Sequence, residues 1–327
     1  MPIRLGNAVI GFSIAALAGA QQLPTIQVPV RLVTVPTLVF SKEGRMISGL
    51  QRTDFRVFDK GRLQNVNMDT ASAPVSVVIA MQANQDVREY LPFMVKTGST
   101  LDAQLVGEAG EAAVITYSGK IAVVKPFDTR DVQAAMGNIS VNGIDARMID
   151  AGMRGIALLK ERPSSRSRVL LFMGQPVDSG SESRLVTLRE QAERENVSIY
   201  ALALPGLGKA FVSDTVSLEG LPRDRGGFKA GIDLGKLIST LNRSRKVEKG
   251  ADPFSILTAA TGGTQLHFRK QSELENAIAT IGMELRGAYL LSYSPNSAEI
   301  GYHAIRVTVE VSGAKTYARP GYWLSGE

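Results

Sequence analysis

The stretch PVSVVIAMQANQD, residues 74–86, decides the fold of this chain. Residues 75–81 form a mostly apolar run that is rich in β-branched side chains and lacks alternation, a pattern typical of a strand buried on both faces of a parallel sheet. In doubly wound sheets, ligands bind at the loops that leave the carboxyl ends of such strands. Residues 82–86 are therefore expected to belong to a functional site.

The region downstream of residue 74 alternates strand and helix patterns, which predicts parallel βαβ units. Ser272 and Glu275 have the spacing of a capping box at the start of the last helix. The predicted strands are 111–117, 120–127, 168–173, 197–204 and 265–268, and the predicted helices are 87–106, 131–136, 147–159, 183–195, 253–260 and 272–285. Within 87–106, Pro92 and Gly98 are expected to shift the start of the helix or to kink it.

The two ends of the chain show β patterns instead. Strands are predicted at 28–40 and 54–59 near the start, and at 288–293 and 302–311 near the end. Each end alone has too few strands to be stable, so the two are expected to pair into one small β-sandwich. The predicted fold class is α/β: a doubly wound, mostly parallel sheet inserted in that sandwich. Its predicted parts are 24–73, 74–285 with an insertion at 206–250, and 286–323.

The first 20 residues have the layout of a secretory signal peptide. Arg4 precedes an apolar run at 8–17, and Ala18-Gly19-Ala20 offers a cleavage site before Gln21. The apolar run is shorter than the roughly 20 residues of a membrane span, which disfavours the alternative of an anchor. Export to the periplasm or the medium is predicted, with no transmembrane span after cleavage.

Composition excludes several kinds of chemistry. The chain has no cysteine, so thiol catalysis, thiolate metal sites and lipid attachment through cysteine are ruled out. Its 327 residues are 44% hydrophobic and 21% charged, as in globular proteins, and the net charge of +6 is modest. The insertion at 206–250 carries nine Lys and Arg against five acids, but only two aromatics. It is interpreted as a solvated loop, and no nucleic-acid partner is expected.

The strand at 75–81 and its loop resemble the von Willebrand factor type A (VWA) domain, whose first ion-contacting motif is Asp-x-Ser-x-Ser. Gln82, Asn84 and Asp86 stand in the three ligand positions of that motif. Nearly the whole chain also resembles the VWFA-related family of exported bacterial proteins. The stretches that carry this second resemblance are Ser48-Gly49-Leu50, Asp54-Phe55, 59–61, Thr261-Gly262-Gly263, 289–295 and Arg319-Pro320-Gly321-Tyr322.

The resemblance implies an ion site that has lost most of its ligands. VWA sites hold Mg²⁺ or Mn²⁺ through hard oxygen atoms. Ala146 stands where a threonine is expected, and Gly174 stands where the last acidic ligand is expected, within Met173-Gly174-Gln175. No bound metal or other cofactor is therefore predicted. The alternative is a displaced Mg²⁺ or Mn²⁺ site made by Asp86, Asp145 and Asp178, serving adhesion or hydrolysis.

The preferred functional interpretation is a noncatalytic module that binds a protein partner. Its predicted contact residues are Gln82, Asn84, Asp86, Asp145 and Gln175. His267 and His303 are the only histidines, and neither lies near a nucleophile in the sequence, which disfavours a Ser-His-Asp site. A structural envelope protein that associates through sheet edges is the third hypothesis.

Overall fold

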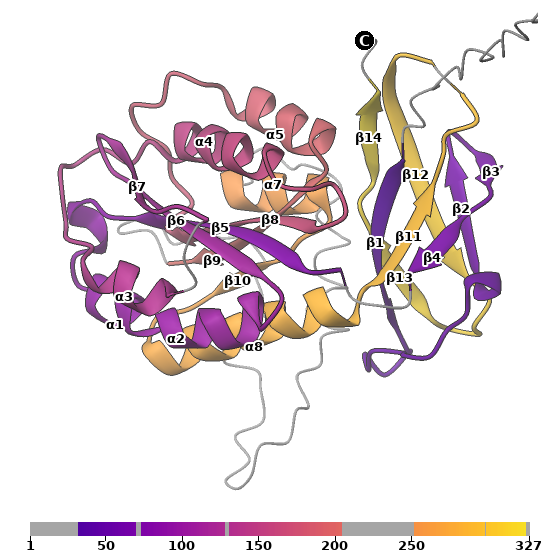
Figure 1. The fold of residues 1–327 in the computed structure, drawn as a ribbon, viewed down its shortest axis with the longest axis horizontal. Coiled ribbons are helices and arrows are strands. Elements are labelled where there is room, and N and C mark those ends of the chain that lie inside the picture. Colours follow the sequence, from indigo (N-terminus) through magenta and orange to yellow (C-terminus); the bar gives the residue numbers. More distant parts are fainter. Residues whose placement is uncertain (1–31, 70–72, 128–130, 205–251, 298, 325–327) are drawn as a thin grey trace, which may run out of the picture. The chain divides into compact units, whose positions relative to one another are not determined.

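The computed structural model describes residues 32–69, 73–127, 131–204, 252–297 and 299–324 (Figure 1). The predicted signal peptide at 1–20 and the basic insertion at 206–250 lie outside the described residues. Within the described ranges, no helix has both the length and the apolar character needed to span a bilayer.

A six-stranded sheet forms the centre of the α/β domain, in the order β10-β9-β8-β5-β6-β7. All neighbours pair in parallel except β6 and β7, which are antiparallel. The chain winds outward from β5 in one direction and from β8 in the other, so the fold is doubly wound, as predicted. The strands are β5 (Val75–Gln82), β6 (Glu111–Tyr117), β7 (Ile121–Lys125), β8 (Ser167–Gly174), β9 (Val197–Ala203) and β10 (Gln265–His267).

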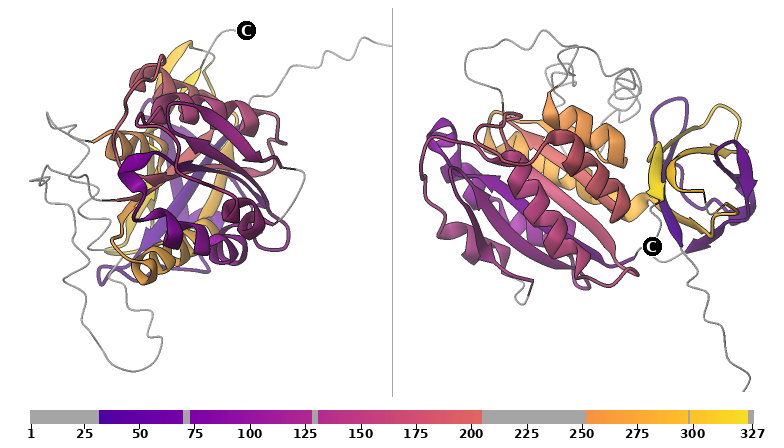
Figure 2. Two further views of the ribbon diagram at one scale, coloured as in Figure 1. Left: turned by 90° about the vertical axis from the view of Figure 1, so that its left-hand side faces the viewer. Right: turned by 90° about the horizontal axis from the view of Figure 1, so that it is seen from above.

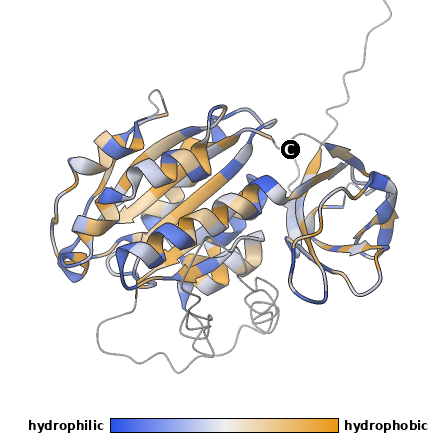
Figure 3. Ribbon diagram, turned by 90° about the horizontal axis from the view of Figure 1, so that it is seen from below, coloured by the Kyte–Doolittle hydropathy of each residue, from blue (hydrophilic) through white to orange (hydrophobic). Residues whose placement is uncertain are grey.

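Helices cover both faces of this sheet, with α4, α5 and α7 on one face and α1, α2, α3 and α8 on the other (Figure 1). This coverage explains why β5 is buried almost along its whole length, and why the strands are coloured as hydrophobic in Figure 3. The helices are α1 (Leu91–Lys96), α2 (Gly98–Leu101), α3 (Val132–Gly137), α4 (Met148–Lys160), α5 (Leu185–Arg194), α7 (Pro253–Thr261) and α8 (Gln271–Gly287).

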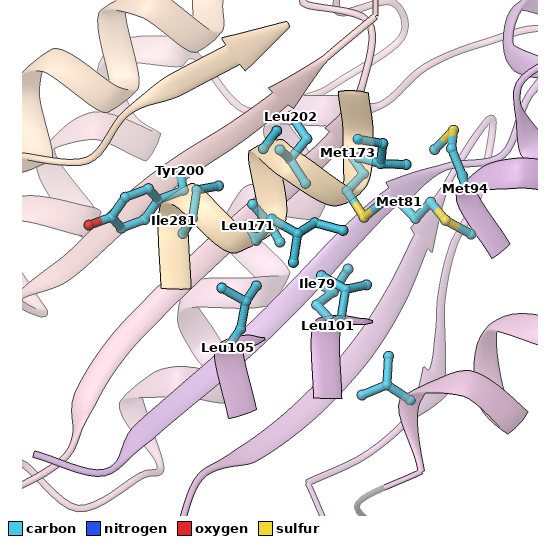
Figure 4. Packing of buried hydrophobic residues seen from close by; sticks show 14 of the residues in the cluster. Ile79, Met81, Met94, Leu101, Leu105, Leu171, Met173, Tyr200, Leu202 and Ile281 are labelled. Carbon is cyan, nitrogen blue, oxygen red and sulfur yellow. The ribbon is translucent and has the colours of Figure 1, made fainter. Parts of the chain in front are cut away.

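Side chains from the sheet and from the α8 face interlock in the larger core. Figure 4 shows Ile79 and Met81 of β5 beside Leu171 of β8, with Leu101 of α2 and Ile281 of α8 packed against them. All five side chains are fully buried. Close packing of this kind holds the strand ends, and the loops that leave them, in fixed positions.

The segment predicted to be helical at 87–106, with a shifted start or a kink at Pro92 and Gly98, is helical but divided into four short pieces. The structure has a short 3-10 turn at Gln85–Val87, then α1 and α2, and then a π-helical turn at Asp102–Val106. Pro92 lies in the first turn of α1 and Gly98 begins α2. Proline is tolerated only near a helix start and glycine weakens a helix interior, so these residues divide the segment.

The capping box predicted at Ser272 and Glu275 is also wrong. Helix α8 begins one residue earlier, at Gln271, after an extended Lys270. Glu273, rather than Glu275, accepts a hydrogen bond from the backbone N–H of Arg269 at 2.9 Å. Ser272 therefore lies inside the helix, where its hydroxyl cannot cap the first turn.

The two ends of the chain interleave in a sandwich of two four-stranded sheets, ordered β13-β1-β11-β4 and β14-β12-β2-β3. Figure 2 shows the indigo strands of the first segment beside the yellow strands of the last. Each sheet thus mixes strands from both ends, as the fold prediction required. The strands are β1 (Val33–Phe40), β2 (Phe55–Asp59), β3 (Arg62–Gln64), β4 (Asn67–Asp69), β11 (Tyr289–Tyr293), β12 (Gly301–Val309), β13 (Lys315–Ala318) and β14 (Gly321–Leu324).

A charged cluster lies inside the sandwich, around Asp59 at the end of β2. Its carboxylate accepts hydrogen bonds from the hydroxyls of Tyr293 and Tyr322, at 3.0 and 2.8 Å, and lies 2.8 Å from Nδ1 of His303. Nε2 of His303 donates to the carbonyl of Glu299 at 2.7 Å. Both ring nitrogens of His303 thus lie beside oxygen acceptors, which hold the ring in one orientation. Burial, together with Tyr322 and Asp59, raises the pKa of Tyr293.

Candidate functional site

The candidate site lies at the carboxyl ends of β5 and β8, which are neighbours in the sheet where the winding direction changes. Gln82 ends β5 and Gly174 ends β8. Helix α4 begins at Met148, after the loop that carries Asp145 and Ala146. All the positions predicted from the ion-site motif therefore lie at this end of the sheet.

Two buried amides form a continuous hydrogen-bonded chain through the site. Oε1 of Gln82 accepts from the backbone N–H of Gln175 at 2.6 Å, and Nε2 of Gln82 donates to Oδ1 of Asn84 at 2.8 Å. Nδ2 of Asn84 then donates to Asp86 at 3.0 Å and to the carbonyl of Ile144 at 2.8 Å. Both amide side chains are fully buried. The chain links three loops without any charged group at its centre.

The partners of these amides fix which atom is oxygen and which is nitrogen. The N–H of Gln175 can only donate, so Gln82 must present its oxygen there and its nitrogen to Asn84. Asn84 in turn must present nitrogen to a carboxylate and a carbonyl, both acceptors. Three of the four amide hydrogens of Gln82 and Asn84 are thus bonded to oxygen acceptors within the loops. A cation here would meet neutral amides, whose oxygens already accept hydrogen bonds, in place of carboxylate ligands.

Gly174 is required by the close approach of Gln82. A Cβ atom at Gly174 would lie 2.6 Å from both Cβ and Oε1 of Gln82, and 2.8 Å from the hydroxyl of Tyr117. The amide of Gln82 thus occupies the space into which an acidic side chain at position 174 would project. The hydroxyl of Tyr117 is buried and has no hydrogen-bond partner among the described residues, and burial raises its pKa.

Ala146 is buried, and its backbone is bound to Ser179. Its N–H donates to Oγ of Ser179 at 2.8 Å, and its carbonyl accepts from the N–H of Ser179 at 2.9 Å. This pairing ties the loop before α4 to the loop after β8. Backbone contacts here connect the same two loops that a threonine and an acidic ligand would approach in an intact ion site.

Asp178 caps helix α4. Its Oδ1 accepts from the N–H of Ile149 at 2.8 Å and from the hydroxyl of Ser181 at 2.6 Å. A carboxylate at this position satisfies an N–H group that has no partner within the helix, and it interacts favourably with the helix dipole. The turn-forming character of Asp is therefore sufficient to explain this residue.

Asp150 supports the same loop and was not singled out from the sequence. Burial alone would raise its pKa, but hydrogen bonds from Ser183, from the N–H of Glu182 and from Arg147 hold the pKa of Asp150 well below its usual range. The Arg147 guanidinium lies 2.7 Å from its carboxylate. The only signal in the sequence was the spacing: Asp150 lies three residues after Arg147, in the first turn of α4, where the two side chains can pair.

Only part of the predicted contact set reaches the surface. Asp86 and Asp145 are exposed, whereas Gln82, Asn84 and Gln175 are buried and cannot touch a partner. Ile144, which sequence reasoning missed, is 76% exposed. Its carbonyl accepts a hydrogen bond from Nδ2 of Asn84, so the buried amide chain fixes the position of this loop. The only sequence signal was an apolar residue within the polar loop 142–145.

The three carboxylates of the predicted displaced ion site are not assembled as a ligand set. Asp178 accepts a hydrogen bond from an N–H group of α4, and Asp86 accepts one from Asn84. Asp145 lies near Gly180. In the described ranges, no three His, Asp or Glu side chains are grouped so that they could hold a metal ion.

Neither histidine lies in an open site. His303 is fully buried in the sandwich cluster, and His267 is partly buried in edge strand β10, where burial lowers its pKa. No serine hydroxyl is bonded to either ring among the described residues.

The sequence matches no family model and none of the curated proteins. Among solved structures, it is similar to an aerotolerance-related membrane protein from Bacteroides fragilis, with 12% identity over 64% of this chain and 98% of that one, and a TM-score of 0.42. It is similar to the SpRpn10 VWA domain, with 13% identity, 62% and 93% coverage, and a TM-score of 0.40.

A von Willebrand factor type A protein from Catenulispora acidiphila matches 91% of this chain and 64% of its own, with 11% identity and a TM-score of 0.46. Likeness at these levels adds nothing to the fold evident from the strand order. That order, with a loop site beyond β5 and β8, is the architecture that the resemblance implied. The central domain of this chain therefore has the doubly wound, mostly parallel α/β architecture that the resemblance to VWA domains implied.

Proposed function

We propose that this chain is an exported, noncatalytic protein-interaction or adhesion module of VWA type that binds a protein partner without a metal ion. The observation that carries the metal-independent part is the buried amide chain from Gln175 through Gln82 and Asn84 to Asp86. A dication that gives up part of its water needs compensating carboxylates, and these positions supply amide hydrogens instead.

The amide chain also supplies the rigidity that a metal would otherwise give. It ties the loop after β5 to the loop after β8 and to the loop before α4. Further backbone bonds join Gln85 to Gly143 at 3.1 Å and Asn142 to Ala83 at 2.7 Å. A binding surface held in one conformation loses less entropy when a partner docks.

The surface above these loops combines one apolar side chain with two carboxylates. Ile144 projects into solvent, and neither Asp86 nor Asp145 forms an ion pair with a described residue. An apolar contact point with hydrated charges beside it matches the core and rim of a protein interface. We place the partner contact on Ile144, Asp86 and Asp145.

Site-specific crosslinking tests this assignment. A photoreactive amino acid at Ile144 is expected to capture a discrete partner from the native envelope, equally with and without EDTA. The matched control is the same group at Ile300, which is 69% exposed in the sandwich. Capture that disappears with EDTA would contradict metal independence, and equal capture from both positions would contradict the site.

Export has its own test. N-terminal sequencing of protein recovered from the envelope or medium is expected to begin near Gln21, as the Ala18-Gly19-Ala20 sequence predicts. An intact Met1 end in that fraction would contradict cleavage.

A further inference from the structure

A second site is present on the sandwich, apart from the loops of the α/β domain. A half-open cleft of about 500 Å³ lies beside strands β2 and β3. Its polar lining comes from Arg52, Thr53, Arg56, Gln64, Asn65 and Asn296. The volume is within the range of about 300 to 1,000 Å³ typical of ligand sites.

The lining carries positive charge and no carboxylate. Arg56 is already paired with Glu310, at 2.8 Å. Arg52 makes only a long hydrogen bond of 3.4 Å, from Nη1 to the carbonyl of Val66, and no described carboxylate pairs with it. Its remaining N–H donors match the fork geometry of a carboxylate.

The apolar residues that line the cleft favour a ligand that carries an apolar group as well as a charge. Phe55 and Val66 are buried, while Leu63 is 53% exposed on β3. A small inorganic anion would leave Leu63 uncovered. The only aromatic residue of the lining, Phe55, is 3% exposed and offers no face on which a nucleic-acid base or a sugar ring could stack.

Strand β3 favours an extended ligand. It is the outer strand of the sheet β14-β12-β2-β3, so its free edge faces away from β2. Edge strands accept an added strand through their main-chain groups, and side-chain pockets then select the sequence. In an extended peptide, neighbouring side chains point to opposite sides, so an acidic residue and an apolar residue can reach different walls of a cleft.

We propose that this cleft binds an extended acidic peptide segment of a protein partner, with a carboxylate on Arg52 and an apolar side chain against Leu63. The buried side chain of Gln64, whose Oε1 accepts from the N–H of Asn296 at 3.4 Å, is part of the same lining. This site does not depend on the loops around Ile144.

Fluorescence anisotropy with the full mature chain tests the cleft. The probe is a short, acetylated, fluorescein-labelled peptide of alternating glutamate and leucine. Saturable binding is expected, and Arg52→Gln should weaken it by about ten-fold or more, as loss of a charge-assisted hydrogen bond predicts. Leu63→Ser should weaken it as well. Arg45→Gln removes an exposed arginine outside the cleft and should leave the affinity unchanged.

Unchanged melting temperatures of the three variants establish that each one folds. A probe with glutamine in place of glutamate should bind at least about ten-fold more weakly. Absence of saturable binding, equal affinity in Arg52→Gln, or equal loss in Arg45→Gln would each overturn the site. Tighter binding of a short single-stranded DNA than of the peptide would overturn the choice of a peptide ligand.

Discussion

The protein has two buried polar networks, and they satisfy their hydrogen-bonding groups in different ways. At the loops of the α/β domain, the neutral amide side chains of Gln82 and Asn84 are hydrogen-bonded in series. Inside the sandwich, Asp59 gathers donors from His303, Tyr293 and Tyr322 around one carboxylate. In both networks the buried acceptors have donors, which is the condition for burying polar groups at tolerable cost.

The difference lies in what happens when one member is removed. A neutral chain that loses a link leaves one donor and one acceptor unpaired. A cluster centred on one carboxylate leaves three side chains without their acceptor when that carboxylate is removed. The sandwich network should therefore be the more fragile of the two.

Asp59→Ala should give the largest loss, about 3 to 5 kcal/mol in the free energy of unfolding, because it leaves Nδ1 of His303 and two tyrosine hydroxyls without their acceptor in the core. Urea unfolding measures the loss. The control Asp69→Ala, exposed on β4, should stay within about 0.5 kcal/mol of wild type. A loss below about 1 kcal/mol for Asp59→Ala would show that the cluster contributes little to stability.

Glu284 tests a buried acid that has no cationic partner among the described residues. Burial raises its pKa from 4.5 to about 7, and the hydroxyl of Thr264, at 2.9 Å, is its one hydrogen-bond partner within those ranges. The folded protein therefore keeps this proton up to about pH 7, while the unfolded chain loses it above about pH 4.5. The free energy of unfolding should fall as pH rises through that window, by up to about 3 kcal/mol, and stay level above it.

Glu284→Gln should remove this fall, so that the variant is more stable than wild type at pH 8 and similar to it at pH 4. Urea titrations at several pH values measure both curves. Exposed Glu108, changed to Gln, is the matched control and should keep the wild-type slope. Parallel curves for Glu284→Gln and wild type would mean that Glu284 is ionised in the fold.

Gln82→Leu should cost less, about 2 kcal/mol, since it leaves the N–H of Gln175 and the carbonyl oxygen of Asn84 unpaired but fills the same space. Gln85→Leu, on the exposed side of the loop, should have little effect. Equal costs in thermal or urea unfolding would indicate that the amide chain does not hold the loops.

Metal addition should have no effect at all. Calorimetric titration with Mg²⁺ or Mn²⁺ is expected to show no saturable heat, and the melting temperature should lack the rise that a ligand of the native state causes. Micromolar binding that disappears in Asp86→Ala would restore the ion site and would reverse the contrast between the two networks.

The sequence could predict the fold and the location of the loops, because those depend on local patterns. The apolar run of β5 predicted a buried strand, and the alternation of strand and helix patterns predicted the doubly wound sheet. Pro92 and Gly98 indicated interruptions in the helical segment 87–106, but the sequence did not indicate that it would divide into four short pieces.

Contacts between distant residues could not be predicted in the same way. The positions of Gln82 and Asn84 were evident, but that they bond to each other and to Gln175 depends on the relative positions of β5 and β8. The role of Gly174 depends on the same proximity. His303 carried no sign of Asp59 as its partner, because 244 residues separate them.

That separation has a consequence for biosynthesis. Strand β1 pairs only with β11 and β13 among the described strands, and both come from the last part of the chain. At roughly 5 to 20 residues per second, a ribosome needs roughly 10 to 50 s to pass from Asp59 to His303, which are 244 residues apart. All strands of the α/β sheet are synthesised before β11 and β13, the partners of β1. During that interval the edges of β1 are unpaired and open to other chains. A chain truncated after α8 would contain every strand of the α/β sheet but would lack β11 and β13, so both edges of β1 would be open to pairing with other chains.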